Sequence, residues 1–549
     1  MKLLTYFHTL KHIKFVQIYY RIVKRFAHPQ PNEIEGELRH CAGIWVRHPL
    51  YEQKLFPSNY FRFLNQDGVV HNVSDWNNKK YTKLWLYNLH YFDDLAADGF
   101  DSRKQQHIHY INKWIDENPA PLGNGWEPYP SSLRIVNWVK AFLSGISPDQ
   151  LILNSLAKQA DFLSQDLEWH LLGNHLFVNA KALIFAGTYL KGKVADTWLQ
   201  TGLDIYLKEL DEQVLLDGGN FELSPMYHVI MLVDLLDLIN LWTAYPDKIN
   251  AIFVEKTKQV ATKMIGWLKI MSHKDGEISF FNDTALGVAP NTSKVFEYAT
   301  KLGLHWRENE SMAAEELRVF DLENSGYVVV QSDLYSLISD LAPVGPSYQP
   351  GHAHADTLSY EFSLSNQRVF VNSGISEYGV NKERLRQRQT KAHNTVMVND
   401  LDSSQVWSGF RVAKRANVLN RVINPLVDDC VHFSAAHNGF KKQGVDCMHY
   451  RDWFVKKDSI IVTDQLVGNY INAEGYLHLH PEVKILGVTD EQVLLASGEY
   501  NIFLKVSGSN ISIEDSTWHP EFGMTIKNKK LSFIFTQSAL TIAITWQKK

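Results

Sequence analysis

Residues 221–228 combine side chains suited to proton transfer with a signal for the start of a helix. The segment reads FELSPMYH, in which Ser224 and Pro225 are typical of the N-cap and first position of a helix. Tyr227 and His228 would then lie in the first turn, beside a loop, where functional side chains concentrate. A phenol and an imidazole in such a place can donate or accept a proton. A buried tyrosine bonded to the backbone explains the motif equally well.

A second group of side chains suits a divalent cation. The segment GHAHAD holds His352 and His354 two residues apart, which puts both on one face of an extended chain. This spacing is common at metal sites but is weak evidence by itself. Asn372, in VFVNSG, and His393, in KAHNT, could lie on strands beside His354 and complete the site. A lone histidine such as His393 is normally structural.

A third motif is the tripeptide Gly173-Asn174-His175, which stands just before an apolar segment with helical spacing. Asparagine is a good N-cap, and that role alone would account for Asn174. These motifs must be positioned by two kinds of structure, because the period of the apolar residues changes along the chain. Helical spacing dominates from about residue 75 to 310, most clearly in residues 131–145, 175–190, 226–243 and 251–271.

After about residue 320 the apolar residues alternate with a period of two, as in short strands bounded by turns. Such segments are GYVVVQSD, LSYEFSLS, QRVFVNSG, HNTVMVND, DSIIVTDQ, VKILGV, YNIFLKVSG, LSFIFTQ and LTIAITW. Strands without helices between them predict an antiparallel sandwich, and successive helices with short loops predict stacked helical hairpins. We therefore expect an α+β chain with a helical arm at 1–74, a helical domain at 75–315 and a β-sandwich at 316–549.

Composition excludes some functions and leaves others open. The chain has 549 residues, a net charge of −5 and 12% aromatic residues. The negative charge argues against non-specific nucleic-acid binding, which needs a basic surface. Aromatic rings stack on sugar rings, but they also fill large cores. The three cysteines give no disulfide framework, although a bridge between Cys430 and Cys447 is possible.

Residues 1–26 are basic and amphipathic, but they lack the apolar core and cleavage site of a signal peptide. Without such a signal the chain is expected in the cytoplasm by default, with export by another route left open. No run reaches the roughly 18 apolar residues of a spanning helix. We expect residues 1–26 to pack onto the rest of the protein, and the alternative is a helix lying on a membrane surface.

Taken together, the motifs resemble those of the heparinase II/III-like polysaccharide lyases and their alginate-lyase relatives. The matching segments occur in the family's order over both halves of the chain: LWLYNLHYFDDL (84–95), GWEPYPSSLRIVNW (125–138), GNH (173–175), FELSPMYH (221–228), GHAHADTLSYEFSL (351–364), VFVNSGISEYG (369–379) and RQTKAHNTVMVND (388–400). The resemblance implies an incomplete (α/α) toroid joined to an antiparallel β-sandwich. It also implies an active site in the cleft between them.

The resemblance implies a catalytic role for four residues. Asn174 and His175 would bind the carboxylate of a uronic acid, and Tyr227 would protonate the leaving glycosidic oxygen. For one sugar epimer Tyr227 would also abstract the C5 proton, and His352 would be the base on the opposite face. Neutral donors such as Asn174 stabilise the enolate charge that this proton abstraction creates.

The resemblance also implies substrate and metal contacts. Trp126, Glu127, Tyr129 and Arg134 would lie near the substrate channel, although helix packing explains them too, and Tyr378 would be an accessory contact. Arg134 and Arg388 are candidates for the positive charge that tunes Tyr227, and Arg388 is expected near the substrate. His354, Asn372 and His393 match a structural site for one divalent ion (Zn, Mn or Ca). The family commonly has an acidic residue where this chain has Asn372.

The predicted function is β-elimination in a uronate glycan: a glycosaminoglycan, alginate or a bacterial surface polysaccharide. The expected partner is thus an acidic polysaccharide, with no organic cofactor, and the oligomeric state stays open. One alternative is a glycoside hydrolase on a toroid, which needs two carboxylates, and Glu222, Asp283 and Asp356 form no evident pair in the sequence. Another is a non-catalytic glycan-binding protein of surface-polysaccharide assembly. The exact glycan and endo or exo action are left open.

Overall fold

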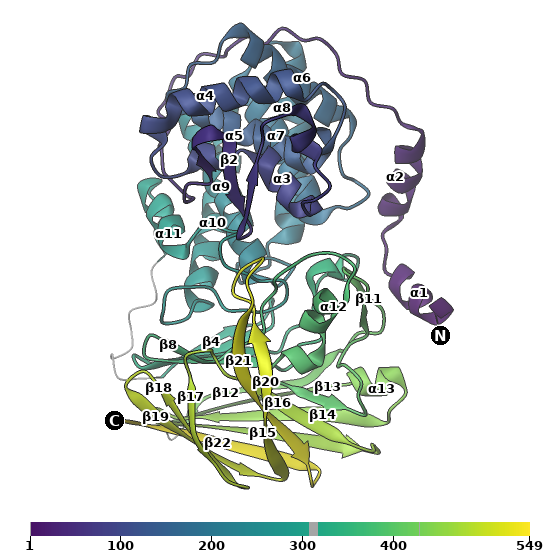
Figure 1. Cartoon of the computed structure of the whole chain (residues 1–549), viewed down its shortest axis with the longest axis vertical. Coiled ribbons are helices and arrows are strands. Elements are labelled where there is room, and N and C mark those ends of the chain that lie inside the picture. Colours follow the sequence, from purple (N-terminus) through teal and green to yellow (C-terminus); the bar gives the residue numbers. More distant parts are fainter. Residues whose placement is uncertain (1, 307–316, 428) are drawn as a thin grey trace.

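The chain folds into a helical half and a half built of antiparallel sheets, as Figure 1 shows. The computed structural model describes residues 2–306, 317–427 and 429–549. The expected fold class, a toroid followed by a β-sandwich, is confirmed. The predicted boundary between residues 315 and 316 lies outside the described residues.

The toroid is built from helices that are packed pairwise along the chain. They are α3 (Lys83–Tyr91), α4 (Phe100–Glu117), α5 (Pro128–Leu143), α6 (Gln150–Gln165), α7 (Gly173–Tyr189), α8 (Lys193–Gln213), α9 (Pro225–Ala244), α10 (Ala251–Ile270) and α11 (Thr292–Lys301). In the middle of the toroid, α7 packs against α5, α8 and α9. The four helices expected from apolar periodicity are present as α5, α7, α9 and α10. Helix α9 is apolar on all sides because it is enclosed by its neighbours.

Helix α9 also has the length and composition of a membrane-spanning helix. Of its most apolar window, 83% is buried inside the protein, which is what a core helix of a globular fold shows. Short 3-10 turns connect many of the elements: η1 (Pro57–Asn59), η2 (Val73–Asn77), η3 (Asp93–Ala96), η4 (Asn124–Trp126), η5 (Pro246–Lys248), η6 (Pro350–His352) and η7 (Thr390–Ala392).

Three antiparallel sheets make up the larger part of the second half. One has the order β4 (Arg318–Leu322), β5 (Tyr327–Gln331), β6 (Tyr335–Asp340), β7 (Tyr360–Leu364), β8 (Gln367–Phe370); the next has the order β20 (Ser509–Trp518), β21 (Ile526–Phe535), β16 (Ala473–His478), β9 (Val396–Val398). The largest has the order β12 (Val418–Val427), β13 (Cys430–His437), β14 (Cys447–Val455), β15 (Ser459–Gly468), β22 (Ala539–Lys548), β19 (Tyr500–Ser507), β18 (Gln492–Ser497), β17 (Lys484–Val488). The helices α12 (Lys382–Arg388) and α13 (Gly439–Gln443) and the pair β10 (Val406–Trp407) and β11 (Arg411–Val412) complete this half.

Strand β5 shows how the sheets join the two halves. Val328 and Val330 point into the core shared with the largest sheet. Tyr327 and Val329 point the other way and pack against toroid residues such as Trp267. Both faces of β5 are therefore buried, which explains its unbroken apolar sequence. This packing fixes one end of the toroid against the sandwich.

The N-terminal arm is helical only in its first part. Helices α1 (Lys2–Leu10) and α2 (Phe15–Phe26) lie at one side of the molecule (Figure 1), where α2 contacts the toroid through Gln17, Tyr20 and Lys24. The chain then runs without regular structure to a small antiparallel sheet, β1 (Leu55–Phe56), β2 (Tyr60–Phe63) and β3 (Gln66–Val69). The predicted arm at 1–74 thus ends in strands, which its short aromatic segments favour.

The disulfide bond between Cys430 and Cys447, which the sequence leaves possible, does not form. Val431 pairs with Val455 and His437 pairs with His449, so Cys430 and Cys447 lie at opposite ends of the β13–β14 ladder. Cys41, Cys430 and Cys447 are free thiols.

Candidate active site

A cavity of about 260 Å³ lies where the toroid meets the second half of the chain. Six of the predicted site residues line it: Tyr129, Asn174, His175, Tyr227, His352 and Tyr378. These residues are far apart in the sequence, but the packing of the two halves brings their side chains to one place. A larger cavity of about 590 Å³ lies next to it and contains none of these six. Because chemistry needs reactive groups that converge, the smaller cavity is the candidate site.

The local sequence fixes Tyr227 at the loop end of α9. The Ser224 side chain accepts a hydrogen bond from the Tyr227 amide at 3.3 Å, and Pro225 occupies the first position of the helix. The expected N-cap and helix start are confirmed. The Ser224 hydroxyl also donates to the carbonyl of Asp283 at 2.6 Å, which ties the start of α9 to a second site segment.

The phenol of Tyr227 meets the second half of the chain directly. Its hydroxyl lies 3.0 Å from the Tyr378 hydroxyl, and its ring centroid lies 4.1 Å from that of His352. Burial, followed by the neighbouring Tyr378, raises the pKa of Tyr227 well above its usual value. The phenol is therefore protonated at neutral pH and is prepared to donate a proton.

This contact corrects one expectation. We expected His352 to act from the opposite face of a sugar bound between it and Tyr227. The two rings touch, with an angle of 34° between their planes, so no sugar ring fits between them. Both groups instead face the cavity from the same side.

A buried carboxylate sets the protonation pattern of His352. Its Nδ1 lies 2.8 Å from Oδ2 of Asp283. Burial opposes ionisation of Asp283, but Arg384 and the two histidines outweigh it and hold its pKa well below the usual range. An ionised carboxylate accepts a hydrogen bond from Nδ1–H, which leaves the lone pair on Nε2. That nitrogen is the acceptor expected of a general base.

Arg384 is a site residue that the motifs did not reveal. Its guanidinium forms two bonds with Asp283, one of them 2.6 Å long, and lies 5.0 Å from the ring centroid of Tyr378. We expected Arg134 or Arg388 to tune Tyr227, but the pKa of Tyr227 is raised. The charge of Arg384 acts on Asp283 and Tyr378. Its position in a basic helix, KERLRQR, gave no signal that separates it from Arg386 or Arg388.

The GNH motif is held in a strained turn. Leu172 has a φ of 64° and Gly173 has a φ of 56°, a region that favours glycine. A Cβ on Gly173 would lie 2.5 Å from Oε1 of Gln349. The N-cap position belongs to Leu172, so the N-cap explanation of Asn174 is wrong. Its Oδ1 is buried and has no hydrogen-bond partner among the described residues.

His175 brings positive charge to the same wall of the cavity. Its Nδ1 lies 3.0 Å from Oε1 of Glu168. Burial disfavours the charged imidazole, but the Glu168 carboxylate outweighs burial and raises the pKa of His175. The Tyr129 ring lies 4.6 Å away and covers the imidazole. A carboxylate entering the cavity would meet a histidine whose pKa is raised and a polar amide.

Glu222 is a second residue whose importance the sequence did not show. It is buried, and neither of its carboxylate oxygens has a hydrogen-bond partner in the part of the chain that the structure describes. Burial raises its pKa, which His352 and His175 oppose. Its Oε2 lies 3.6 Å from Nε2 of His352. Only the fold could place this carboxyl behind the imidazole.

Four predicted substrate contacts do not line the cavity, and their expected role is corrected. Trp126 is buried and donates to the carbonyl of Asn118 at 3.0 Å. Glu127 accepts a hydrogen bond from the hydroxyl of Tyr87. Tyr87 lines the cavity, so it separates Glu127 from the cavity.

The two arginines among these four residues are fully buried. Arg134 bonds Oε1 of Gln159 at 2.8 Å and lies 3.8 Å from the ring centroid of Trp114, inside the toroid. Arg388 donates to the carbonyl of Ala353 at 2.9 Å and so holds the strand-entry segment that carries the two histidines. Both stabilise the walls of the site and neither faces the cavity.

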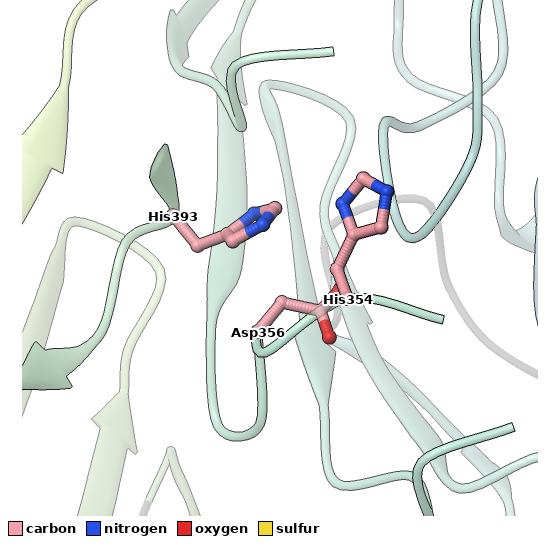
Figure 2. A group of neighbouring side chains, drawn as sticks. All are labelled: His354, Asp356 and His393. Atoms are coloured by element: carbon pink, nitrogen blue, oxygen red, sulfur yellow. The ribbon is translucent and has the colours of Figure 1, made fainter. Parts of the chain in front are cut away.

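Behind His352, three buried side chains form a cluster with the composition of a metal site. Figure 2 shows His354, Asp356 and His393 with their polar groups turned toward one another. One ligand atom of each lies within 4.8 Å of the others. Nδ1 of His354 and Nε2 of His393 are buried and lack hydrogen-bond partners among the described residues. Two orphaned imidazole nitrogens and one carboxylate suit a divalent cation.

The third member of this cluster differs from the prediction. Asn372 Oδ1 lies 3.2 Å from Nδ1 of His393 and accepts a hydrogen bond from it, so this oxygen orients the imidazole. Asp356, which belongs to the same HAHAD segment as His354, takes the place expected for Asn372 as the third candidate ligand. The cluster is linked to His352 because His354 Nε2 donates to Asp283 at 2.7 Å.

Comparisons with known proteins identify the family. The heparinase II/III N-terminus model matches residues 2–303, and the heparinase II/III-like C-terminal model matches residues 315–547. Heparin-sulfate lyase of Bacteroides stercoris is 24% identical over 433 residues, which is 74% of this chain and 59% of the relative. Heparin-sulfate lyase of Pedobacter heparinus is 24% identical over 362 residues, 60% of this chain and 54% of the relative. The chain spans 54–62% of the length of the curated relatives that it matches.

Solved structures share the fold. Heparinase III superposes with a TM-score of 0.68 at 18% identity, over 88% of this chain and 80% of that chain. A chondroitinase AC lyase superposes with a TM-score of 0.52 at 11% identity, over 90% of this chain and 78% of that chain. With both halves matched by family models over nearly the whole sequence, the chain belongs to the heparinase II/III family.

Proposed function

We propose that the protein is a polysaccharide lyase that cleaves a uronic-acid-containing glycan, of the glycosaminoglycan type, by β-elimination. The observation that carries the proposal is the contact between Tyr227 and His352 at a cavity that both halves line. A protonated phenol and an imidazole with a free lone pair are the acid and base that elimination needs. The heparin-sulfate lyases among its relatives support this activity.

The proposed reaction needs no external reactant. Nε2 of His352 takes the proton from C5 of the uronate, and the electron pair of that C–H bond forms the C4–C5 double bond. The bond between C4 and the glycosidic oxygen breaks, and Tyr227 donates its proton to that oxygen. The imidazolium then returns a proton to the phenolate beside it, which restores both groups.

The contact between the rings also favours one stereochemistry. Because Tyr227 and His352 face the cavity from one side, the C5 proton and the leaving oxygen should lie on the same face of the sugar. Glucuronate has this syn arrangement, and its C5 epimer iduronate does not. We propose that glucuronate-containing glycans are the better substrates.

The uronate carboxylate is proposed to bind at Asn174 and His175. Abstraction of the C5 proton moves negative charge onto this carboxylate, and fixed donors stabilise that charge without reorganising. The raised pKa of His175 favours its cationic form, which suits an anionic ligand. A Tyr129 ring beside it could stack on a sugar face.

We further propose that His354, Asp356 and His393 hold one divalent ion. Bound there, the ion would cross-link the strand-entry segments behind His352 without reaching the substrate. The arrangement in which Asp283 bonds His354 while the opposite ring nitrogen stays free is typical of metal-bound histidines. Elemental analysis of purified protein, with His393→Gln as the control, tests this site.

The decisive test of the activity is the ultraviolet absorbance of a 4,5-unsaturated uronate. Purified protein is mixed with heparan sulfate, chondroitin sulfate, hyaluronan, alginate and bacterial capsular polymers. Absorbance that rises with one of them supports the lyase. New reducing ends without absorbance indicate a hydrolase, and binding without cleavage indicates a glycan-binding protein; either result overturns the proposal.

A further inference from the structure

Helix α2 is amphipathic, but its apolar face points to solvent. Phe15, Ile18, Tyr19, Ile22 and Phe26 follow helical spacing, so they form one stripe. Their side chains are between 46% and 80% exposed. In a globular fold such a stripe normally faces the core. An outward stripe of this kind marks a surface for a partner.

The opposite face of α2 fixes this orientation. Gln17 is buried and donates to the carbonyl of Leu171 at 3.1 Å. Tyr20 stacks on Trp169 with ring centroids 5.7 Å apart, and Lys24 pairs with Asp166 at 2.9 Å. One face of α2 therefore packs against the toroid, and the apolar stripe lies on the face that points to solvent.

Helix α1 continues the exposed apolar surface. Leu4, Phe7 and Leu10 are each more than half exposed. On its other side, the Tyr6 ring lies 5.2 Å from Trp407, and Thr9 Oγ1 accepts from the Trp407 indole at 3.1 Å. Both helices thus attach to the body by one face and present apolar side chains on another.

Cationic side chains gather beside the two helices. The basic groups that act on one another here are Lys11, Arg21, Arg411, Lys414, Arg415 and Lys442. No acidic residue precedes Glu33 in the sequence, whereas the whole chain carries a net charge of −5. Basic side chains thus lie beside both helices, while the acidic neighbours of α2, Glu212 and Asp166, are paired with Lys14 and Lys24.

We propose that the outer face of α1 and α2, with the adjoining basic residues, docks on an anionic lipid bilayer. Helices that lie in the bilayer interface combine an apolar stripe with lysine and arginine in this way. The aromatic side chains would enter the headgroup region, and the cations would meet anionic lipids. A symmetric dimer through this face would bring the cations of two copies together, which opposes self-association. Phe410, which lines the cavity, directly precedes Arg411, so the docked face adjoins the candidate site.

Sedimentation of the full chain with lipid vesicles tests the docking surface. Wild type should bind vesicles that contain phosphatidylglycerol more tightly than vesicles of phosphatidylcholine alone, and added salt should weaken the binding. The double variant Phe15→Ser/Ile22→Ser should lose at least about tenfold in affinity, because each apolar side chain buried is worth about that factor. The control Leu216→Ser/Ile471→Ser removes two exposed apolar side chains elsewhere and should bind like wild type.

Melting temperatures verify that each variant is folded. The proposal is overturned if folded wild type ignores anionic vesicles, or if the α2 variant binds them as well as the control does. A dimer of wild type in solution that dissociates in the α2 variant would assign the stripe to a second copy and also overturn it.

A separate observation concerns the shape of the catalytic cavity. The turn between β2 and β3 reaches across the cleft to the sandwich, where Asn65 Nδ2 donates to the carbonyl of Phe522 at 3.0 Å and to Oε2 of Glu521 at 2.9 Å. Packing is tight there, since a Cβ on Gly523 would lie 2.2 Å from the carbonyl oxygen of Leu64. This contact bridges the first and the last parts of the chain.

The bridge and the toroid floor close two sides of the cavity. Tyr51, Leu64, Val288 and Phe522 line both the catalytic cavity and the larger cavity beside it, so they form the wall between them. At the floor, Lys181 pairs with Asp234 and Asp237 at 2.7 Å each, and Lys140 pairs with Asp237 at 2.8 Å. At about 260 Å³, the cavity is below the usual ligand-pocket range of about 300–1,000 Å³.

We infer, resting on the proposed lyase activity, that the enzyme acts from a chain end. A polymer that is cut internally must extend beyond the site in both directions, and the wall blocks one of them. Size-exclusion analysis of the substrate during digestion should show small unsaturated products from the start while the remaining polymer stays long. Asn65→Ala should shift cleavage toward internal sites, and Asn469→Ala, an exposed asparagine away from the cleft, should not.

The two proposals fail in different ways. Absence of unsaturated products from every glycan overturns the lyase activity. Unsaturated products together with an early fall in polymer length leave the activity intact and overturn the chain-end inference.

Discussion

Two buried aspartates in this protein have nearly the same chemical surroundings. Asp283, between the halves, is bonded to His352, His354 and Arg384. Asp464, inside the sandwich, is bonded to His449 at 2.6 Å and to Arg451 at 2.6 and 2.9 Å. In both cases burial opposes ionisation, and the cationic neighbours outweigh it and lower the pKa of the aspartate.

The difference between them is what the histidines face. The His352 side chain is 14% exposed and lines the cavity beside Tyr227. His449 is fully buried, and its Nδ1 lies 3.2 Å from Nε2 of His437. A perturbed Asp–His–Arg group is therefore not a site by itself. It becomes one where an imidazole nitrogen faces a cavity, as Nε2 of His352 does beside the Glu222 carboxyl at 3.6 Å.

Replacement of the two histidines gives the largest expected contrast. His352→Gln removes the general base, so kcat/KM should fall by about 10²–10⁴-fold while the melting temperature changes little. His449→Gln should leave kcat/KM unchanged and lower the melting temperature. Initial rates and thermal melts of both variants measure this. Equal losses of activity in the two folded variants would erase the proposed distinction.

Replacement of the aspartates sharpens the comparison. Asp283→Asn and Asp464→Asn each leave a buried arginine without its partner, which should cost about 3–5 kcal/mol in the free energy of unfolding. Only Asp283→Asn should also reduce kcat/KM, because it releases the Nδ1 proton of His352. Denaturant titrations and rates on the same preparations separate the effects. An active Asp283→Asn enzyme would contradict the assigned role.

The pH dependence of the unfolding free energy tests the role of Asp464, the aspartate inside the sandwich, and gives the smallest expected effect. The pKa of Asp464 is lowered from 3.8 to about 2 in the folded protein. Its stabilisation is therefore fully present above about pH 4, and it is lost as the pH falls through 2. The loss amounts to about 2 kcal/mol. The difference in unfolding free energy between wild type and Asp464→Asn should shrink over this window, and a constant difference would contradict the assignment.

The helical half and the sheet-rich half were predictable because the spacing of apolar residues differs clearly between them. Apolar residues repeat every three or four positions in α5 and alternate in β15 and β22, where each strand has one solvated face. Several strands were not predicted, among them β12, β13, β14, β16, β18 and β20. Strand β20 shows one reason. It reads SNISIEDSTW and is largely exposed, so it has no continuous apolar alternation to detect. The sequence also gave no signal for β1–β3, which are short.

The site was predictable only where a motif carried it. Tyr227 and His352 stand in ordered motifs, but the partnership of Arg384 with Asp283 spans 101 residues and depends on tertiary folding. Arg134 was assigned to the substrate because a sequence does not tell which side of α5 faces the toroid interior. The contact of the Tyr227 and His352 rings, which changed the expected stereochemistry, likewise required coordinates.

The most direct test of the account compares Tyr227→Phe with Tyr360→Phe. Tyr360 is also buried, and its hydroxyl has no hydrogen-bond partner among the described residues, so the control removes the same atom far from the cavity. The rate at which unsaturated uronate forms should fall by about 10²–10⁴-fold in Tyr227→Phe and stay at the wild-type value in Tyr360→Phe. A folded Tyr227→Phe enzyme that keeps more than about a tenth of the wild-type rate would contradict the role of this phenol as the acid.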